Sequence, residues 1–375
     1  MKYNMVDLGG QYKKIKPEVD KAIQEVMENT SFINGPSVHK FQKSLEDYLN
    51  VKHVIPCANG TDALQVALMA LDLKPGDEVI TTSFTFIATA EVIALLQLTP
   101  VLVDVDPDTF NIDPVAVEKA VTPKTRAIIP VHLFGQPADL HAMIMIAQKH
   151  NLYIIEDNAQ AIGADYTCPE SGNTKKAGTF GHIGCTSFFP SKNLGAFGDG
   201  GAIFTNNDEL AEQMRVVVNH GMKVRYYHDY VGVNSRLDGI QAAVLDIKLK
   251  HLDEYAAARQ KAAAYYNNAF ANHPKIRTPV TAAGGTHVFH QYTLVLNNVD
   301  REGLMKHLAD KGIASAVYYP VPLHLQKAYL DPRYKEGDFP VTEALSKSVI
   351  SLPIHTELTE EIQKEITDAF LEFVG

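Results

Sequence analysis

The stretch TSFFPSKNLGAFGDGGAIFTN, residues 186–206, joins two short β-rich runs through a loop that holds one lysine and several glycines. Lys192 follows the aromatic pair Phe188 and Phe189. Glycines remove side chains where a flat, bulky group would have to approach the backbone. The loop lacks the GxxxxGK[ST] order of a phosphate loop. From these residues alone, Lys192 is either a solvated turn residue, as lysine usually is, or an amine held in a pocket for covalent chemistry.

Outward from this stretch, β-rich runs alternate with helical segments up to about residue 205. Segments 61–73 and 138–151 carry apolar residues at three- and four-residue spacing, which predicts helices. The runs that predict strands are DEVITT, PVLVDV, RAIIPVHL, LYIIEDN, CTSFFP and GAIFTN. Strands alternating with helices indicate an α/β fold with a mostly parallel sheet covered on both faces.

The rest of the chain predicts a second, smaller unit. Long helices are expected from 206 to about 270, the longest within 235–270, and a β/α unit follows as HQYTLVL, DREGLMKHLADKG and ASAVYYPVP. A chain of 375 residues exceeds what one core usually organises. We therefore expect a large domain over 1–245 and a small C-terminal domain over 246–375, bridged by the long helix.

Composition excludes several classes of protein. The net charge of -10 argues against a general binder of nucleic acid or anionic membranes. The three cysteines, Cys57, Cys168 and Cys185, are far apart and predict neither a disulfide framework nor a zinc site. The first residues do not form a signal peptide, and the longest apolar stretch, VIALLQLTPVLVDV, is too short and too polar to span a bilayer. We expect a soluble cytoplasmic protein without a metal.

Two segments present groups suited to an anionic or flat ligand. In CANGTDALQVAL, Asn59-Gly60 predicts a turn and Thr61 a helix start, so free backbone N–H groups would suit a phosphate there. A capped helix after a turn explains the same residues without a ligand. In TTSFTFIATAEVI, the aromatic Phe86 would either stack on a flat ligand or lie in the core.

A third segment, LYIIEDNAQAIGA, delivers Glu156 and Asp157 to a strand end, where α/β folds place ligands. An acid there would hold a protonated ring nitrogen or a ribose, or cap the following turn. Asp157 is the better candidate because it ends the run. Gln160 follows within reach of the same place.

Read in order, CANGTDAL, TSFTFIATAEVI, VHLFGQPADL, IIEDNAQAIGA, TSFFPSKNLGAFGDGGAI and VGVNSRLDGIQAAVL resemble the sugar aminotransferases of the DegT/DnrJ/EryC1/StrS family. The resemblance covers nearly the whole chain. It implies pyridoxal-phosphate (PLP) transferase fold type I, like that of aspartate aminotransferase. That fold has a large domain with a mostly parallel seven-stranded sheet and a small C-terminal α/β domain. It also implies a homodimer with shared active sites.

The resemblance assigns a role to each candidate. Lys192 would form the imine with the cofactor and act as general base, then general acid. Asp157 would pair with the pyridine nitrogen and keep the ring an electron sink. Gln160 would lie against the ring or its 3-hydroxyl, and Phe86 would stack on the other face. The phosphate would be bound by Gly60, Thr61 and Ser187, and by Asn234 from the adjacent subunit.

The resemblance also implies the substrates. L-glutamate would donate the amino group to a nucleotide-linked keto sugar for cell-surface polysaccharide such as lipopolysaccharide O-antigen. The closest likeness is to the C3 branch, the UDP-2-acetamido-2-deoxy-3-oxo-glucuronate aminotransferases. There Arg236 would meet the sugar carboxylate, as a two-pronged guanidinium suits. Tyr318 and Tyr319 would contact substrate, although Tyr318 stands where that branch carries a histidine.

Other readings stay open from the sequence. Lys223 and Arg225 would either bind the diphosphate or lie in a solvated loop. The sugar could instead be a dTDP-3-keto-6-deoxyhexose or a 4-keto sugar. An amino-acid aminotransferase of the same fold is a rival, as is a PLP-binding regulator without turnover. An intact Lys192 with Asp157 argues against the regulator.

Overall fold

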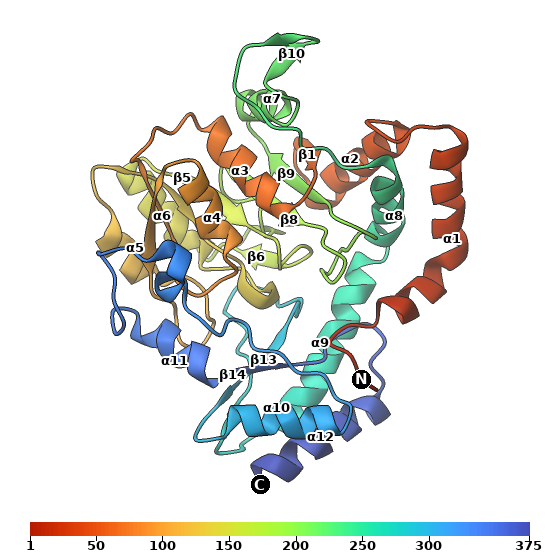
Figure 1. Cartoon of the computed structure of the whole chain (residues 1–375), viewed down its shortest axis with the longest axis vertical. Coiled ribbons are helices and arrows are strands. Elements are labelled where there is room, and N and C mark those ends of the chain that lie inside the picture. The colour runs from red at the N-terminus through yellow and green to blue at the C-terminus, as the bar shows by residue number, and fades with distance from the viewer.

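A computed structural model describes all 375 residues, and Figure 1 shows a larger upper part above a smaller lower part. The larger part contains a seven-stranded sheet. Its strands, in spatial order, are β1 (His53–Cys57), β9 (Gly201–Thr205), β8 (Ile183–Ser187), β5 (Tyr153–Asp157), β4 (Thr125–Ile129), β2 (Glu78–Thr82) and β3 (Thr99–Val103).

The strand directions confirm the predicted mostly parallel sheet. Strands β8, β5, β4, β2 and β3 are parallel to one another, and β9 is antiparallel to both β1 and β8. All six predicted β-rich runs overlap one of these strands. Strand β1 was not predicted, because its run HVIPC is short and carries a proline.

Helices cover both faces of this sheet, as the alternation of side chains along a strand requires. On one face, Ile55, Ile129 and Ile155 pack against the helices α3 (Gly60–Ala70), α4 (Ala88–Leu95) and α7 (Asp208–Val217). On the other face, neighbouring strand residues pack against α2 (Pro36–Leu49) and α8 (Gly239–Leu249), and against α5 (Pro114–Ala120) and α6 (Leu140–His150). The predicted helices at 61–73 and 138–151 are confirmed as α3 and α6.

The smaller part is built on a three-stranded antiparallel sheet of β12 (Ile276–Arg277), β13 (Tyr292–Leu296) and β14 (Val349–Leu352). Helices α9 (Leu252–Ala269), α10 (Arg301–Asp310) and α12 (Glu360–Val374) share its core, and α11 (Pro340–Ser348) precedes β14. The run ASAVYYPVP is not the expected strand; only Ala316 pairs, with Ser351 of β14. Pro320 and Pro322 remove two ladder donors from that segment.

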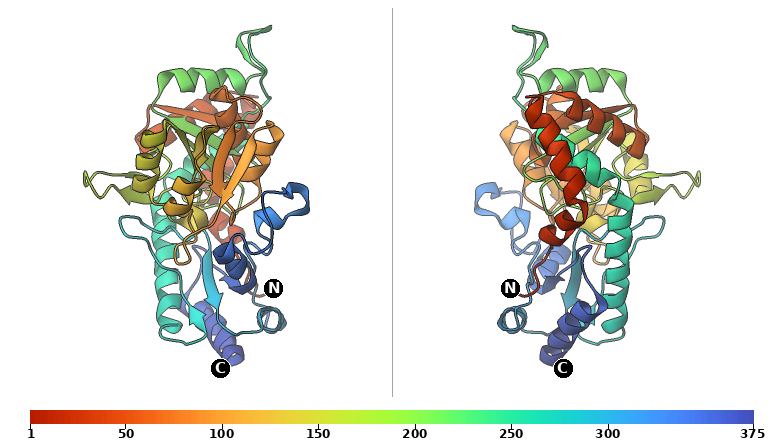
Figure 2. Two further views of the ribbon diagram at one scale, coloured as in Figure 1. Left: turned by 90° about the vertical axis from the view of Figure 1, so that its left-hand side faces the viewer. Right: turned by 90° about the vertical axis from the view of Figure 1, so that its right-hand side faces the viewer.

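The expected long helix over 235–270 is two helices, α8 and α9, with a break at Lys250–His251. Helix α8 packs on α1 (Leu8–Glu28) and α2, whereas α9 descends to the smaller part (Figure 2). Residues before α1 also reach that part, where Tyr3 bridges Ile313. The division at residue 245 therefore stays a prediction.

Two hairpins and three short 3₁₀ helices complete the chain. The hairpins are β6 (Asp165–Thr167) with β7 (Thr174–Lys176), and β10 (Met222–Val224) with β11 (Tyr227–His228). The second hairpin projects beyond α7 at the top of Figure 1. The 3₁₀ helices are Leu133–Gly135, Leu323–Leu325 and Lys327–Tyr329. None of the helices has both the length and the apolar character that crossing a membrane requires.

Candidate active site

Several of the predicted site residues lie at the edge of the large sheet where its parallel strands end. Asp157 is the last residue of β5, Ser187 is the last of β8, and Gly60 opens α3 directly after β1. Lys192 follows Ser187 in the loop between β8 and β9, and its backbone N–H bonds to the carbonyl of Phe189 at 2.8 Å. Open α/β sheets bind ligands at this edge.

The amine of Lys192 and the carboxylate of Asp157 influence each other inside the protein. Burial lowers the pKa of Lys192 to about 8, and the Asp157 carboxylate opposes that shift. Burial raises the pKa of Asp157, and the N–H of Ala159, the hydroxyl of Thr89 and the charge of Lys192 oppose it. Desolvation is the larger cause in both groups, because each loses water that would stabilise its charge.

Beside this pair lies a chain of oriented polar and aromatic groups. The Oε1 of Gln160 accepts a hydrogen bond from the Phe134 N–H at 2.9 Å, and its Nε2 donates to the Tyr319 hydroxyl at 3.2 Å. Burial raises the pKa of Tyr319, so its hydroxyl stays neutral. Phe86, 55% exposed, has its ring centroid 6.4 Å from that of Tyr319. An exposed ring beside buried polar groups is suited to stacking on a flat ligand.

Gly60 and Ser187 meet at the start of α3. A Cβ added at Gly60 would lie 2.6 Å from the Cβ of Ser187, so the close approach requires glycine. The Asn59 side chain caps the Asp62 N–H at 2.8 Å, and the N–H groups of Gly60 and Thr61 precede the first intrahelical bond. This helix start with a serine hydroxyl beside it forms a cradle suited to a phosphate.

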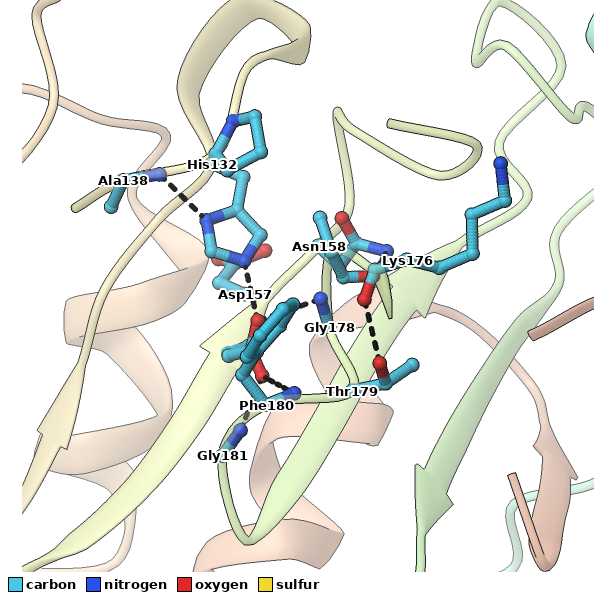
Figure 3. Close-up of polar contacts among 12 residues, drawn as sticks. His132, Ala138, Asp157, Asn158, Lys176, Gly178, Thr179, Phe180 and Gly181 are labelled. Atoms are coloured by element: carbon cyan, nitrogen blue, oxygen red, sulfur yellow. Dashed lines mark hydrogen bonds and ion pairs between the residues drawn. The ribbon is translucent and has the colours of Figure 1, made fainter. Parts of the chain in front are cut away.

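Glu156 belongs to a different structure from Asp157, although the two are adjacent. Successive residues of β5 point to opposite sides, and the buried Glu156 carboxylate accepts from the N–H groups of Gly178, Phe180 and Gly181 at 2.6, 2.7 and 2.5 Å (Figure 3). It also contacts Nε2 of His132 at 2.9 Å. Glu156 thus holds the turn that leads into β8, and of the two carboxylates only that of Asp157 acts on the charge of Lys192.

The contact made by Nδ1 of His132 decides which ring nitrogen carries the proton in the contact with Glu156. The Nδ1 of His132 accepts from the Ala138 N–H at 3.1 Å, so Nε2 carries the proton and donates it to Glu156. Figure 3 shows this chain of contacts running from Ala138 through His132 to the end of β5. His132 and Glu156 therefore support the strand end from behind.

The segment 234–236 does not join the site of its own chain. The hydroxyl of the buried Ser235 accepts from the Ala58 N–H at 3.1 Å, close to the start of α3. Asn234 is exposed, and its Oδ1 accepts a hydrogen bond from Arg236. The segment is thus anchored beside the phosphate cradle, while Asn234 and Arg236 contact each other rather than Lys192 or Asp157.

Lys223 and Arg225, the residues considered for a diphosphate, lie on the β10–β11 hairpin. Lys223 forms an ion pair with Glu212 of α7, and the guanidinium of Arg225 lies 4.9 Å from the ring centre of Tyr226. Both side chains are exposed. The structure does not bring either of them to the cluster around Lys192.

The residues present fit pyridoxal phosphate. Lys192 is partly buried, and only desolvation and the Asp157 charge shift the pKa of its amine, so no hydrogen bond holds the amine in its place. Asp157 offers a buried carboxylate, and Gly60 and Ser187 form the phosphate cradle that a Cβ would fill. These three features match the aldehyde, the ring nitrogen and the phosphate of that cofactor.

Thr89 is one contributor that the sequence reasoning missed. Its hydroxyl donates to Asp157 Oδ2 at 2.9 Å. Thr89 sits among apolar residues in TTSFTFIATAEVI, one of several threonines in that segment. The sequence carried no signal that would have paired it with a carboxylate 68 residues away.

Comparison with known proteins agrees with this geometry. A family model described as the DegT/DnrJ/EryC1/StrS aminotransferase family matches residues 13–371. The chain therefore belongs to that family, whose members are PLP-dependent aminotransferases.

Two curated relatives and one solved structure are close along almost their whole length. A protein of Geobacillus stearothermophilus named "Pleiotropic regulatory protein" is 49% identical, with 100% of this chain and 99% of the relative covered. The UDP-2-acetamido-2-deoxy-3-oxo-D-glucuronate aminotransferase of Pseudomonas aeruginosa is 47% identical over 94% of this chain and 95% of its own. The structure of DesV from S. venezuelae in complex with a ketimine intermediate has a TM-score of 0.94 at 40% identity, covering 99% and 98% of the two chains.

Proposed function

We propose that this protein transfers an amino group from L-glutamate to C3 of a nucleotide-linked keto sugar, UDP-2-acetamido-2-deoxy-3-oxo-glucuronate, with pyridoxal phosphate as cofactor. The observation that carries the proposal is the partly buried amine of Lys192, with a pKa lowered to about 8, and the buried carboxylate of Asp157 whose charge acts on it. A pocket of this kind suits covalent amine chemistry at neutral pH. The product would enter cell-surface polysaccharide.

Each residue of the cluster would hold one part of the cofactor. The Asp157 carboxylate would bind the ring nitrogen, Phe86 would stack on the ring, and Gln160 would bind beside it. The N–H groups of Gly60 and Thr61 and the Ser187 hydroxyl would bind the phosphate. The fixed amide of Gln160, held by Phe134 and Tyr319, supports this placement because its orientation is already determined.

Pyridoxal phosphate supplies the electron sink that stabilises a carbanion at the carbon bearing the amine. Lys192 Nζ would take the proton from that carbon and return it elsewhere. With its pKa lowered to about 8, this amine is neutral in a useful fraction of molecules near neutral pH. The Asp157 carboxylate would keep the ring nitrogen protonated throughout both half-reactions.

The second subunit would complete each site. Asn234 and Arg236 flank Ser235, which is fixed to its own chain beside α3, so both are presented outward. In a dimer, Asn234 would bind the partner's cofactor phosphate, and Arg236 would bind the sugar carboxylate. A mixture of Lys192→Ala and Asn234→Ala chains tests this. We expect hybrid dimers to recover activity that neither variant has alone, and no recovery would contradict shared sites.

The choice of sugar rests on Arg236 and on two adjacent tyrosines. Arg236 favours a carboxylate on the sugar, because a guanidinium binds one in two places. Tyr318 and Tyr319, joined by a ring contact at 5.9 Å, would line the sugar site. A dTDP-3-keto-6-deoxyhexose or a 4-keto sugar is the alternative. The glucuronate aminotransferase name of the Pseudomonas relative favours the first choice.

Glutamate-dependent amination of UDP- and dTDP-linked 3-keto and 4-keto sugars, read by mass, tests the function. We expect amination of the UDP-3-oxo-glucuronate. Arg236→Lys serves as the matched variant, because it keeps the charge and loses the fork; it should raise KM for the glucuronate more than for a sugar without a carboxylate. Amination of 4-keto sugars alone would refute the C3 assignment, and amination of none would refute a sugar substrate. Turnover of keto acids alone would identify an amino-acid aminotransferase.

A further inference from the structure

Thr89 contacts Asp157 from a different element of the fold. It is the second residue of α4, its side chain is 1% exposed, and its Oγ1 donates to Asp157 Oδ2 at 2.9 Å. The other carboxylate oxygen, Oδ1, accepts from the Ala159 N–H at 3.1 Å. Each oxygen of an ionised carboxylate offers two acceptor sites, so both keep one for a further donor.

The backbone of Asp157 is held separately from its side chain. Its N–H donates to the Pro130 carbonyl at 2.9 Å, and its carbonyl accepts from the His132 N–H at 3.0 Å. On the other side Asp157 pairs with Cys185 of β8. The backbone therefore has no freedom to reorient the carboxylate, and the side-chain rotation depends on its two donors.

The two donors connect the Asp157 carboxylate to different parts of the fold. The Ala159 N–H is two residues along the chain and forms a local turn contact. The Thr89 hydroxyl comes from α4, whose Val92 and Ile93 are packed in the core between α3 and the sheet. Thr89 is thus the one donor that ties the carboxylate at the end of β5 to the helix layer that covers the sheet.

We propose that Thr89 is a positioning residue whose hydroxyl keeps the Asp157 carboxylate ionised and directed at the ring nitrogen of the cofactor. This inference rests on the proposed function, in which Asp157 binds that nitrogen. Burial favours the neutral acid, and a hydrogen bond to the charged form favours the carboxylate. A neutral Asp157 would no longer hold the ring nitrogen protonated, so the effect of Thr89 passes through Asp157.

Thr89→Val is the informative variant, because valine keeps the shape and removes the hydroxyl. Apo-protein is titrated with pyridoxal phosphate, and the visible absorbance of the reconstituted protein is followed against pH. A hydrogen bond to a charged group contributes on the order of tenfold or more in binding, so we expect the dissociation constant to rise by about tenfold. The pH at the midpoint of the change in visible absorbance should also shift. Thr89→Ser should restore both within about threefold, since it keeps the donor.

Thr81→Val is the matched control. Thr81 is also a fully buried threonine, and its hydroxyl donates to the Ile129 carbonyl at 2.9 Å rather than to Asp157. We expect it to lower the melting temperature of the apo-protein without changing cofactor affinity or the spectral midpoint. If Thr89→Val behaves like Thr81→Val, the positioning role is refuted. Should Thr89→Val not fold, Thr89→Ala is measured in the same way.

A double-variant cycle with Asp157→Asn separates this inference from the proposed function. If Thr89 acts through Asp157, Thr89→Val adds less than twofold to the loss of affinity caused by Asp157→Asn. Additive losses would overturn the inference and leave the role of Asp157 intact. Unchanged affinity and spectrum in Asp157→Asn itself would instead refute the placement of the cofactor in the proposed function.

Discussion

The pH dependence of cofactor attachment follows from the environment of Lys192. The reacting form of an amine is the neutral one, and burial lowers the Lys192 pKa from 10.5 to about 8. At pH 8, about half of the Lys192 amines are neutral, against about 0.3% for an ordinary lysine. Apo-protein mixed with pyridoxal phosphate should therefore gain its visible absorbance at a rate that rises with pH to a midpoint near 8.

Replacing Asp157 should shift the pH midpoint of cofactor attachment in a direction that its charge determines. Its carboxylate raises the Lys192 pKa, so Asp157→Asn should move the midpoint below 8. Stopped-flow absorbance over pH 6 to 10.5, with trapping of the adduct by borohydride and mapping by mass, measures both values. Lys248 is an internal control. Burial also lowers its pKa to about 8, but its amine donates to the Gly195 carbonyl at 2.5 Å.

We expect the trapped cofactor on Lys192 and none on Lys248. A wild-type midpoint near 10, or an upward shift in Asp157→Asn, would refute the electrostatic reasoning. Attachment to Lys248 would show that a lowered pKa alone selects the reacting lysine, without the cradle around Lys192.

Two further perturbations test the cradle and the contact between the two parts of the chain. In Gly60→Ala, the new Cβ would meet the Cβ of Ser187 at 2.6 Å. We therefore expect the dissociation constant of pyridoxal phosphate to rise by at least about tenfold. Gly9→Ala is the control: its new Cβ would make only ordinary contacts, so it should match wild type in the same titration. Asp104→Ala removes the acceptor for the Val341 and Thr342 N–H groups at the start of α11. Urea unfolding should therefore show that the free energy of unfolding falls by about 1 to 3 kcal/mol. An unchanged urea midpoint would contradict this capping role.

Much of the fold follows from local pattern. The β-rich runs and the helices at 61–73 and 138–151 were predictable because burial on two faces imposes apolar runs and three- and four-residue spacing. The strand predicted in ASAVYYPVP was wrong because Pro320 and Pro322 remove two ladder donors, and only Ala316 pairs, with Ser351. The break between α8 and α9 carries neither proline nor glycine, so no local signal marked it.

The site was predictable in its residues and less so in its contacts. Glu156 and Asp157 were both candidates from sequence, and strand alternation separates them into a structural carboxylate and one that faces Lys192. The roles of Gln160, Phe86 and Ser187 stay predictions, as do those of Asn234 and Arg236. The contact of Thr89 with Asp157 joins residues 68 positions apart, beyond the reach of any local pattern.

The sequence by itself determined the α/β alternation, the family and the set of chemical groups, because these depend on periodicity and on ordered motifs. Tertiary structure decided the pKa values and the contacts of those groups. Burial lowers the pKa of Lys192 and raises that of Asp157, and both shifts depend on how much water the folded chain excludes. Packing also decided which carboxylate of the ED pair faces the amine, and which helix supplies the hydroxyl that directs it.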